Sequence, residues 1–369
     1  MLLIIFGEKM SDFRIAVFEG DGIGPEIMAP TLKILESVES SQSDYKFSYE
    51  ITPAGAKHYL ETGEALPKSS IALAEECDAI LLSAMGLPDV RYPDGTEITP
   101  QIELRMLFDL FAGVRPVTVR NDDFSPLTLP DGEVIDFVLV RESTEGLFHS
   151  MSTGEVTHDR ARETLQITRK TSEKLFDFTF ELAKQRKASG QGAGRVTCVD
   201  KANVFRAFAF FRDVFKERAK LHADIATDYA YVDAMALWMV QKPWAFDVLV
   251  TENMFGDILS DLGAGLMGGL GLAPSADIGE NHAVFQPCHG SAPDIAGKGI
   301  ANPFAMILSA AMMLEWLGHR HGVSQMNVDA IRIQKAVDAV LAEGVAVTGD
   351  IGGKASTREA ADAVLKHLV

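Results

Sequence analysis

The strongest constraint on the fold of this chain is the alternation of short apolar runs with longer helical patterns. Apolar runs that are typical of strands buried on both faces occupy residues 15–18, 79–82, 137–140 and 248–250. Apolar residues recur at helical spacing in residues 25–38, 100–111, 160–186, 203–220, 230–240, 256–266, 303–317 and 328–341. Such alternation predicts an α/β fold in which helices cover both faces of a largely parallel sheet.

Composition narrows the class of protein. A length of 369 residues predicts one large α/β unit or two closely joined lobes, and 47% hydrophobic residues suit a folded soluble chain. The formal charge of -18 disfavours nucleic acid and anionic membranes as partners, because such a surface repels phosphate groups. No segment approaches the roughly 20 apolar residues that a bilayer span requires. Three scattered cysteines, Cys77, Cys198 and Cys288, favour reduced thiols and a cytoplasmic location.

The first residues of the chain do not resemble a targeting signal. Residues 1–7 (MLLIIFG) lack a basic start and are too short for a secretory signal. We interpret residues 1–9 as a non-native or misassigned start, with Met10 as the alternative initiator, because the first strand pattern begins at Phe13.

A glycine-rich turn at residues 20–27 (GDGIGPEI) follows the first apolar run. Its place between a strand and a helix is typical of a dinucleotide-binding turn, but Pro25 occupies the position of the third glycine. Glu39 and Asp44 precede the next strand-like run, so neither is placed to bind a ribose. We therefore predict a mainly structural turn and disfavour a simple Rossmann dehydrogenase.

Charged residues beside buried elements are the candidates for chemistry. Arg105, Arg115 and Arg141 could bind carboxylates with bidentate guanidinium groups, although for any one of them alone a solvated or salt-bridged side chain is the favoured interpretation. Lys201 follows a buried strand and precedes a helix, where burial and the helix dipole favour its neutral, proton-accepting form; a lysine that merely reaches to solvent is an equal alternative.

A second group of candidates is acidic. Asp257 and Asp261 lie four residues apart on one predicted helix face, where they would repel each other unless a cation lay between them. With Asp233 they offer hard oxygen ligands that suit Mg²⁺ or Mn²⁺. An acidic first turn that complements the helix dipole explains Asp257 equally well but Asp261 less well.

The remaining candidate is a long loop at residues 289–303 (HGSAPDIAGKGIANP), which precedes a helix. Its many small residues predict a ligand that lies on the main chain, with a flexible surface loop as the alternative.

Together and in this order, these segments closely resemble the β-decarboxylating dehydrogenases, the family of isopropylmalate, isocitrate, homoisocitrate, malate and tartrate dehydrogenases. The resemblance runs from about residue 13 to the C-terminus. It rests on GDGIGPEI, RMLFDLFAGVRP at 105–116, REST at 141–144, VDKAN at 199–203, YVDAMA at 231–236, NMFGDILSDL at 253–262 and the loop at 289–303.

The resemblance implies a two-lobed isopropylmalate/isocitrate dehydrogenase-like α/β fold with a shared, mixed and largely parallel sheet. A large cofactor-binding domain would comprise residues 10–110 and 268–369, and a small domain at 111–267 would carry substrate and metal residues and the dimer interface. The family is homodimeric with shared active sites, so Lys201 and Asp233 are expected to reach the active site of the partner subunit.

The resemblance also implies the chemistry. NAD would bind the loop through His289, Gly290, Ser291, Ala292, Asp294, Ile295 and Asn302. Asp294 would take the ribose hydroxyls and repel the 2′-phosphate of NADP. Asp233, Asp257 and Asp261 would bind the metal, Lys201 and Asp233 would be catalytic, and Arg105, Arg115 and Arg141 would hold a small 2-hydroxy dicarboxylic acid that is oxidised and then decarboxylated.

Two positions depart from the family pattern. Phe148 stands where relatives have the tyrosine that protonates the enol carbon, and Gln286 stands where many have glutamate; water, another donor or Tyr231 could replace the tyrosine. The residues ahead of Arg105 match neither the isopropylmalate nor the isocitrate pattern. We expect a 3-substituted malate, with 3-isopropylmalate as the family default. Malate, tartrate or isocitrate chemistry and a non-catalytic regulatory paralogue are the alternatives.

Overall fold

The computed structural model describes residues 10–368, so the expectation about the start of the chain lies outside the described residues. The chain divides into two compact units. One unit comprises residues 1–101 and 284–369, and the other comprises residues 102–283. The domain boundaries expected from the sequence lie at 110/111 and 267/268. The observed middle unit is longer at both ends, because it also includes most of the helix Pro100–Leu107, which carries Arg105, and the strand Pro274–Ile278.

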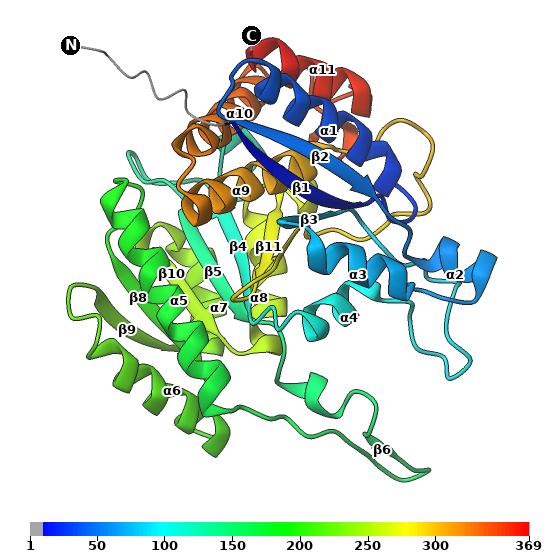
Figure 1. Cartoon of the computed structure of the whole chain (residues 1–369). Helices are drawn as coiled ribbons and strands as arrows, with labels where there is room; N and C mark the ends of the chain where they lie inside the picture. The colour runs from blue at the N-terminus through cyan, green and yellow to red at the C-terminus, as the bar shows by residue number, and fades with distance from the viewer. Residues whose placement is uncertain (1–9, 369) are drawn as a thin grey trace, which may run out of the picture. The chain divides into compact units, whose positions relative to one another are not determined.

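The unit that contains both chain ends is built on four parallel strands in the order β2-β1-β3-β12 (Figure 1). The strands are β1 (Ser11–Phe18), β2 (Tyr45–Ile51), β3 (Ala79–Leu82) and β12 (Ala283–Pro287). The helices are α1 (Gly24–Ser40), α2 (Ala56–Thr62), α3 (Lys68–Glu76), α9 (Phe304–His321), α10 (Ser324–Glu343) and α11 (Thr357–Leu368). The fully buried β3 and the largely buried α9 form the centre of this core.

The middle unit has six strands in the order β11-β4-β5-β10-β8-β9, in which β4 runs antiparallel to both neighbours and the other pairs are parallel. The strands are β4 (Ala112–Thr118), β5 (Asp136–Glu142), β8 (Arg195–Asp200), β9 (Ala226–Tyr231), β10 (Val248–Thr251) and β11 (Pro274–Ile278). The helices are α4 (Pro100–Leu107), α5 (Arg169–Ala188), α6 (Arg206–Ala219), α7 (Val232–Gln241) and α8 (Asn253–Leu266).

These elements confirm the predicted α/β class with a mixed, largely parallel sheet. The four apolar runs that predicted strands lie in β1, β3, β5 and β10, because each is apolar on both faces and is covered by helices on both sides.

The structure corrects one predicted helix, which was expected over residues 160–186. The helix α5 begins at Arg169, where the Thr168 side chain accepts a hydrogen bond from the Thr171 amide and caps the first turn. The preceding residues pair as a small antiparallel hairpin of β6 (Glu155–Val156) and β7 (Ala161–Arg162), which projects from the body of its unit (Figure 1). The residues of β6 and β7 are exposed, so the sequence has no apolar pattern there that would have argued against a helix.

Two further findings answer expectations from composition. All three cysteines are free thiols. Among the described residues, no helix combines the length and apolarity needed to cross a membrane.

Candidate active site

The three predicted carboxylate-binding arginines meet in the middle unit. Arg105 comes from the last turn of α4, Arg115 from β4 and Arg141 from the end of β5, and all three are buried. They surround the carboxylate of Asp277 on β11, which is fully buried. The Asp277 carboxylate accepts hydrogen bonds from Nε of Arg105 at 3.0 Å and from Nη2 of Arg115 at 3.2 Å.

The strand register explains how this cluster forms. Asp277 pairs with Gly113 on β4, and Gly113 pairs with Arg141 on β5, so the three residues form one row across the sheet. A Cβ atom on Gly113 would lie 2.5 Å from the Ser143 hydroxyl and 3.1 Å from Asp277 Oδ1. Glycine is therefore required at position 113 for the charged side chains to meet above it.

The net effect of burial and the neighbouring charges is to lower the pKa of both Asp277 and Arg141 within the cluster. Burial alone would raise the pKa of Asp277, but the guanidinium groups of Arg105, Arg115 and Arg141 outweigh burial and lower the pKa to about 2. Burial lowers the pKa of Arg141 to about 10, with Asp257 opposing the shift. With a pKa of about 10, Arg141 remains cationic at neutral pH, as a carboxylate-binding site requires.

Arg141 connects this cluster to α8, the helix that carries two of the predicted metal ligands. Its guanidinium donates from Nε and Nη2 to Asn253 Oδ1, at 3.2 and 2.7 Å, and from Nη1 to the Asp257 carboxylate. A Cβ on Gly256 would lie 2.5 Å from Arg141 Cγ, so the glycine lets the arginine stem lie against the helix.

Lys201 and Asp233 also meet, at the ends of β8 and β9. The Lys201 ammonium donates a hydrogen bond to Asp233 Oδ1, and this hydrogen bond lowers the pKa of Asp233. The Lys201 nitrogen lies 6.0 Å from the centre of the Tyr231 ring, and the guanidinium of Arg212 lies 5.1 Å from the same ring. Arg212 in turn forms two hydrogen bonds of 2.7 Å with Asp200, the residue before the lysine.

The predicted metal ligands do not gather within one chain. Among residues 10–368, no three acidic, histidine or cysteine side chains lie close enough to hold a metal ion. Asp233, in the first turn of α7, contacts Lys201, which follows β8, whereas Asp257 and Asp261 lie one turn apart on α8. Burial and the nearby charge of Asp257 raise the pKa of Asp261.

The predicted cofactor loop lies in the other unit, between β12 and α9. The His289 Nδ1 contacts the Gly290 carbonyl at 3.0 Å, and its buried Nε2 has no hydrogen-bond partner among the described residues. Burial lowers the pKa of His289, which therefore favours a neutral ring with an unpartnered acceptor nitrogen. Asn302 donates to Asp350 at 3.0 Å and accepts from the Phe304 amide, while Asp294 is exposed and Ile295 is partly buried.

The glycine-rich turn supports this loop. The Ile23 amide donates to the Ser291 carbonyl at 2.9 Å, and a Cβ on Gly22 would lie 2.0 Å from the same oxygen. The Asp21 carboxylate accepts hydrogen bonds from the amides of Ala56, Lys57 and Gly86. The turn therefore packs against neighbouring segments and caps them, in agreement with the prediction that it is mainly structural. Ala292 adopts a positive φ of 38°, an unusual backbone for alanine in a loop expected to meet a ligand.

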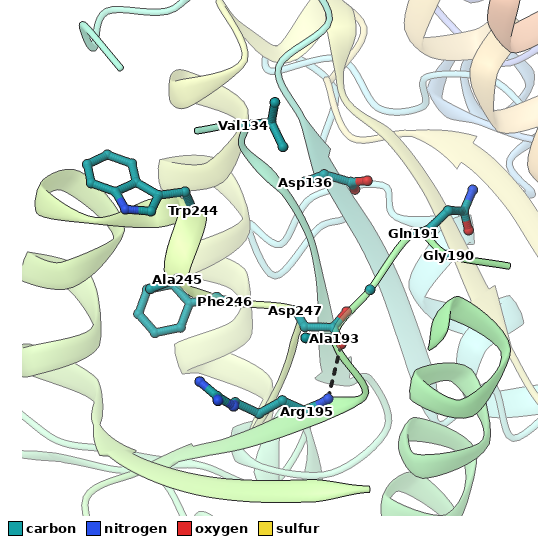
Figure 2. A pocket seen from close by; sticks show the side chains of 11 residues that line it. Val134, Asp136, Gly190, Gln191, Ala193, Arg195, Trp244, Ala245, Phe246 and Asp247 are labelled. Carbon is teal, nitrogen blue, oxygen red and sulfur yellow. Dashed lines mark hydrogen bonds between the residues drawn. The ribbon is translucent and has the colours of Figure 1, made fainter. Parts of the chain in front are cut away.

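A cavity of about 280 Å³ in the middle unit contains none of the predicted site residues (Figure 2). It lies at the amino ends of β5, β8 and β10, whereas Arg141 lies at the carboxyl end of β5 and Lys201 follows the carboxyl end of β8. The Asp247 carboxylate beside it is satisfied by Arg186 and by the amides of Gly194 and Arg195. The polar groups of this cavity therefore serve the fold, and we do not assign it to the active site.

Sequence reasoning missed Asp277 and Asn253. The signal for Asp277 was an acid within the apolar strand sequence PSADI, since a buried carboxylate requires a cationic partner. The structure also places the two residues that depart from the family pattern. Phe148 is in a short 3-10 turn, Leu147–Ser150, and Gln286 is buried on β12.

Comparison with known proteins decides the family. The family model described as isocitrate/isopropylmalate dehydrogenase matches residues 14–364, which is nearly the whole chain. The chain belongs to the isocitrate/isopropylmalate dehydrogenase family. This dehydrogenase is 42% identical over 356 residues to the 3-isopropylmalate/3-methylmalate dehydrogenase of Methanocaldococcus jannaschii, covering 96% of this chain and 98% of that one.

Two other relatives show the range of the family. Homoisocitrate dehydrogenase of Methanocaldococcus jannaschii is 40% identical to this dehydrogenase over 363 residues, covering 96% of this chain and 97% of that one. The crystal structure of isocitrate dehydrogenase from Methylococcus capsulatus matches with a TM-score of 0.83 and 33% identity, covering 96% and 99% of the two chains. The predicted resemblance is confirmed, and the chain is an enzyme, a decarboxylating dehydrogenase.

Glu142, beside Arg141, predicts a pH-dependent stability. Burial raises the pKa of Glu142 to about 7 from an ordinary 4.5, against hydrogen bonds from Thr144 and Glu145. Because the folded pKa is the higher one, this group's contribution to stability is complete below pH 4.5 and is lost as pH rises to about 7. Urea unfolding gives the free energy of unfolding of wild type and of Glu142→Gln at each pH. We expect the wild-type value minus the variant value to fall by up to about 3 kcal/mol between pH 4.5 and 8. A difference that is constant with pH would contradict this.

Proposed function

We propose that this enzyme oxidises and decarboxylates a 3-substituted malate with NAD and Mg²⁺ or Mn²⁺, and that 3-isopropylmalate is its substrate. The observation that carries the proposal is the buried cluster of Arg105, Arg115 and Arg141, which remains cationic and lies beside α8. Guanidinium groups held in this way bind and orient carboxylates. The names of the relatives, which include isopropylmalate and homoisocitrate enzymes, support a small hydroxy acid.

The chain's own residues then divide the work. The arginines hold the substrate carboxylates in register, and the neutral side-chain amine of the partner subunit's Lys201 accepts the proton of the C2 hydroxyl. Bound NAD would supply the acceptor for the hydride of C2. The Asp233 carboxylate accepts a hydrogen bond from the Lys201 side chain of the same chain and holds its nitrogen in place. The resulting β-keto acid loses CO₂, and its enol carbon is protonated by a donor other than Phe148, which has no hydroxyl.

The aspartates fit a divalent cation once two chains are considered. Asp257 and Asp261 offer hard oxygen ligands on one helix face, and their mutual repulsion favours a cation. The partner's Asp233 would complete the set. When bound, the metal stabilises negative charge on the substrate oxygens during oxidation and decarboxylation.

A homodimer with shared active sites is supported by exposed apolar side chains of the middle unit. On α7, only Met235 and Met239 are buried although the helix is largely apolar, and Leu237 and Val240 are exposed. On α8, Ile258 is 63% exposed. Apolar helix faces of this kind are typical of subunit interfaces. The proposed interface lies in a small domain of residues 111–267, and the proposed location of the enzyme is the cytoplasm, in keeping with its free thiols.

The cofactor loop supports NAD, with residues 10–110 and 268–369 as the proposed cofactor domain. The open Nε2 of His289, the adjoining segment Gly290, Ser291 and Ala292, and the side chains of Asp294, Ile295 and Asn302 form the proposed site. The residues fit a nucleotide, because a buried acceptor nitrogen without a partner requires a donor.

We expect Asp294→Asn to narrow the preference for NAD over NADP by about tenfold, because the carboxylate would no longer repel a 2′-phosphate. The measurement is kcat/KM for both cofactors at saturating substrate. The matched control is Asp362→Asn, an exposed aspartate on α11. An unchanged preference in Asp294→Asn would contradict the assignment.

The proposed substrate is tested by following NAD reduction with isopropylmalate, isocitrate, homoisocitrate, D-malate and tartrate in the presence of Mn²⁺. The highest kcat/KM is expected with 3-isopropylmalate. Faster turnover of malate, tartrate or isocitrate would reassign the substrate within the family. Calorimetric binding of substrate and Mn²⁺ with no NADH formation would contradict the proposed reaction.

A further inference from the structure

Asp277 introduces a negative charge into a cluster that is proposed to bind negative substrates. We propose that Asp277 sets the number of carboxylates the site accepts: by cancelling one of the three guanidinium charges, it makes the enzyme select dicarboxylates and reject tricarboxylates. The proposal rests on the proposed function, because it takes the three arginines as the groups that hold the substrate.

The contacts show that Asp277 is part of the cluster rather than a neighbour of it. One carboxylate oxygen accepts from Arg105 Nε, and the other accepts from Arg115 Nη2 and from the Ser143 hydroxyl at 3.3 Å. The residue is fully inaccessible to solvent, and the row through Gly113 leaves no space for a side chain between it and Arg141. A carboxylate in this position cannot turn out to solvent when a substrate arrives.

The charges of the cluster follow from these contacts. Three guanidinium groups and one carboxylate leave two positive charges in a site where each is largely shielded from water. Asp257 also contacts Arg141, but its side chain is largely exposed, so water screens its charge far more than that of the buried Asp277. Two positive charges match a dicarboxylate.

A third carboxylate would therefore enter the site without a cation to pair with it. Burying an unpaired charge is costly, and rejection by an unpaired charge is a common basis of specificity. The family includes both kinds of enzyme, since relatives are named for 3-isopropylmalate and for homoisocitrate. Family membership therefore does not determine whether the substrate carries two or three carboxylates. The charge of Asp277 supplies a physical reason for a substrate with two.

The test compares two inert probes that differ by one carboxylate, methylsuccinate and tricarballylate. Their dissociation constants are measured by calorimetry on the full-length wild type and on Asp277→Asn, which keeps the shape and one acceptor oxygen but removes the charge. Wild type is expected to bind methylsuccinate at least about tenfold more tightly. Asp277→Asn is expected to shift the ratio of the two constants by about tenfold toward tricarballylate.

The matched control is Asp247→Asn, which removes another buried aspartate paired with an arginine, Arg186, away from the cluster. It should lose stability without a change in the ratio. An unchanged ratio in folded Asp277→Asn overturns the proposal, whatever the turnover assay shows. If that variant does not fold, wild type decides, because equal or tighter binding of tricarballylate also overturns it. Absence of turnover with every hydroxy acid, together with the expected binding ratio, counts against the proposed reaction alone.

Discussion

Replacing Lys201 by methionine is expected to lower kcat by about a thousandfold with little change in KM. Methionine has a similar length but cannot accept a proton, and a positioned general base contributes roughly 10²- to 10⁴-fold to such a step. The Lys201 side-chain nitrogen donates a hydrogen bond to Asp233, so the position of the side chain is defined. The measurement is steady-state NADH formation with saturating NAD and Mn²⁺.

The control for this variant is Lys184→Met, which removes a lysine that also pairs with a carboxylate, Glu181, but lies on α5. It should retain wild-type turnover. Wild-type kcat in Lys201→Met would show that another group accepts the proton, and the assignment of Lys201 would be wrong.

Removal of divalent metal is expected to abolish turnover, by more than about a thousandfold, and added Mn²⁺ is expected to restore it. The physical reason lies on α8, where Asp257 and Asp261 repel each other within one turn and the pKa of Asp261 is raised. Because the cation binds only the folded protein, Mn²⁺ at a hundredfold excess over its Kd should also stabilise wild type by about 2.7 kcal/mol. Chelator dialysis followed by activity and thermal unfolding measures both effects.

Asp257→Asn is expected to lose both the activity and the stabilisation by Mn²⁺, whereas Asp213→Asn, an exposed aspartate on α6, should lose neither. Full activity after chelation, or unchanged stabilisation of Asp257→Asn by Mn²⁺, would contradict a metal site at these residues.

The fold class could be predicted because its signal is local. Runs such as residues 79–82 are apolar on both faces, and only a strand covered on both sides buries such a run. The start of α5 could not be predicted in the same way. Residues 160–168 carry no periodicity that excludes a helix, and the start at Arg169 is decided by the Thr168 cap and the hairpin beside it.

The same distinction between local sequence signals and tertiary contacts applies to the candidate site. The sequence by itself predicted roles for the arginines, Lys201, the aspartates and the cofactor loop, because these predictions depend only on motif order and residue type. Only the tertiary structure showed that Asp277 lies among the arginines, that Gly113 makes room for them, and that Asp233 lies with Lys201 rather than with Asp257 in one chain. These contacts join residues as far as 172 positions apart, as for Arg105 and Asp277. Strand register decides which side chains meet, and register depends on how the whole sheet packs.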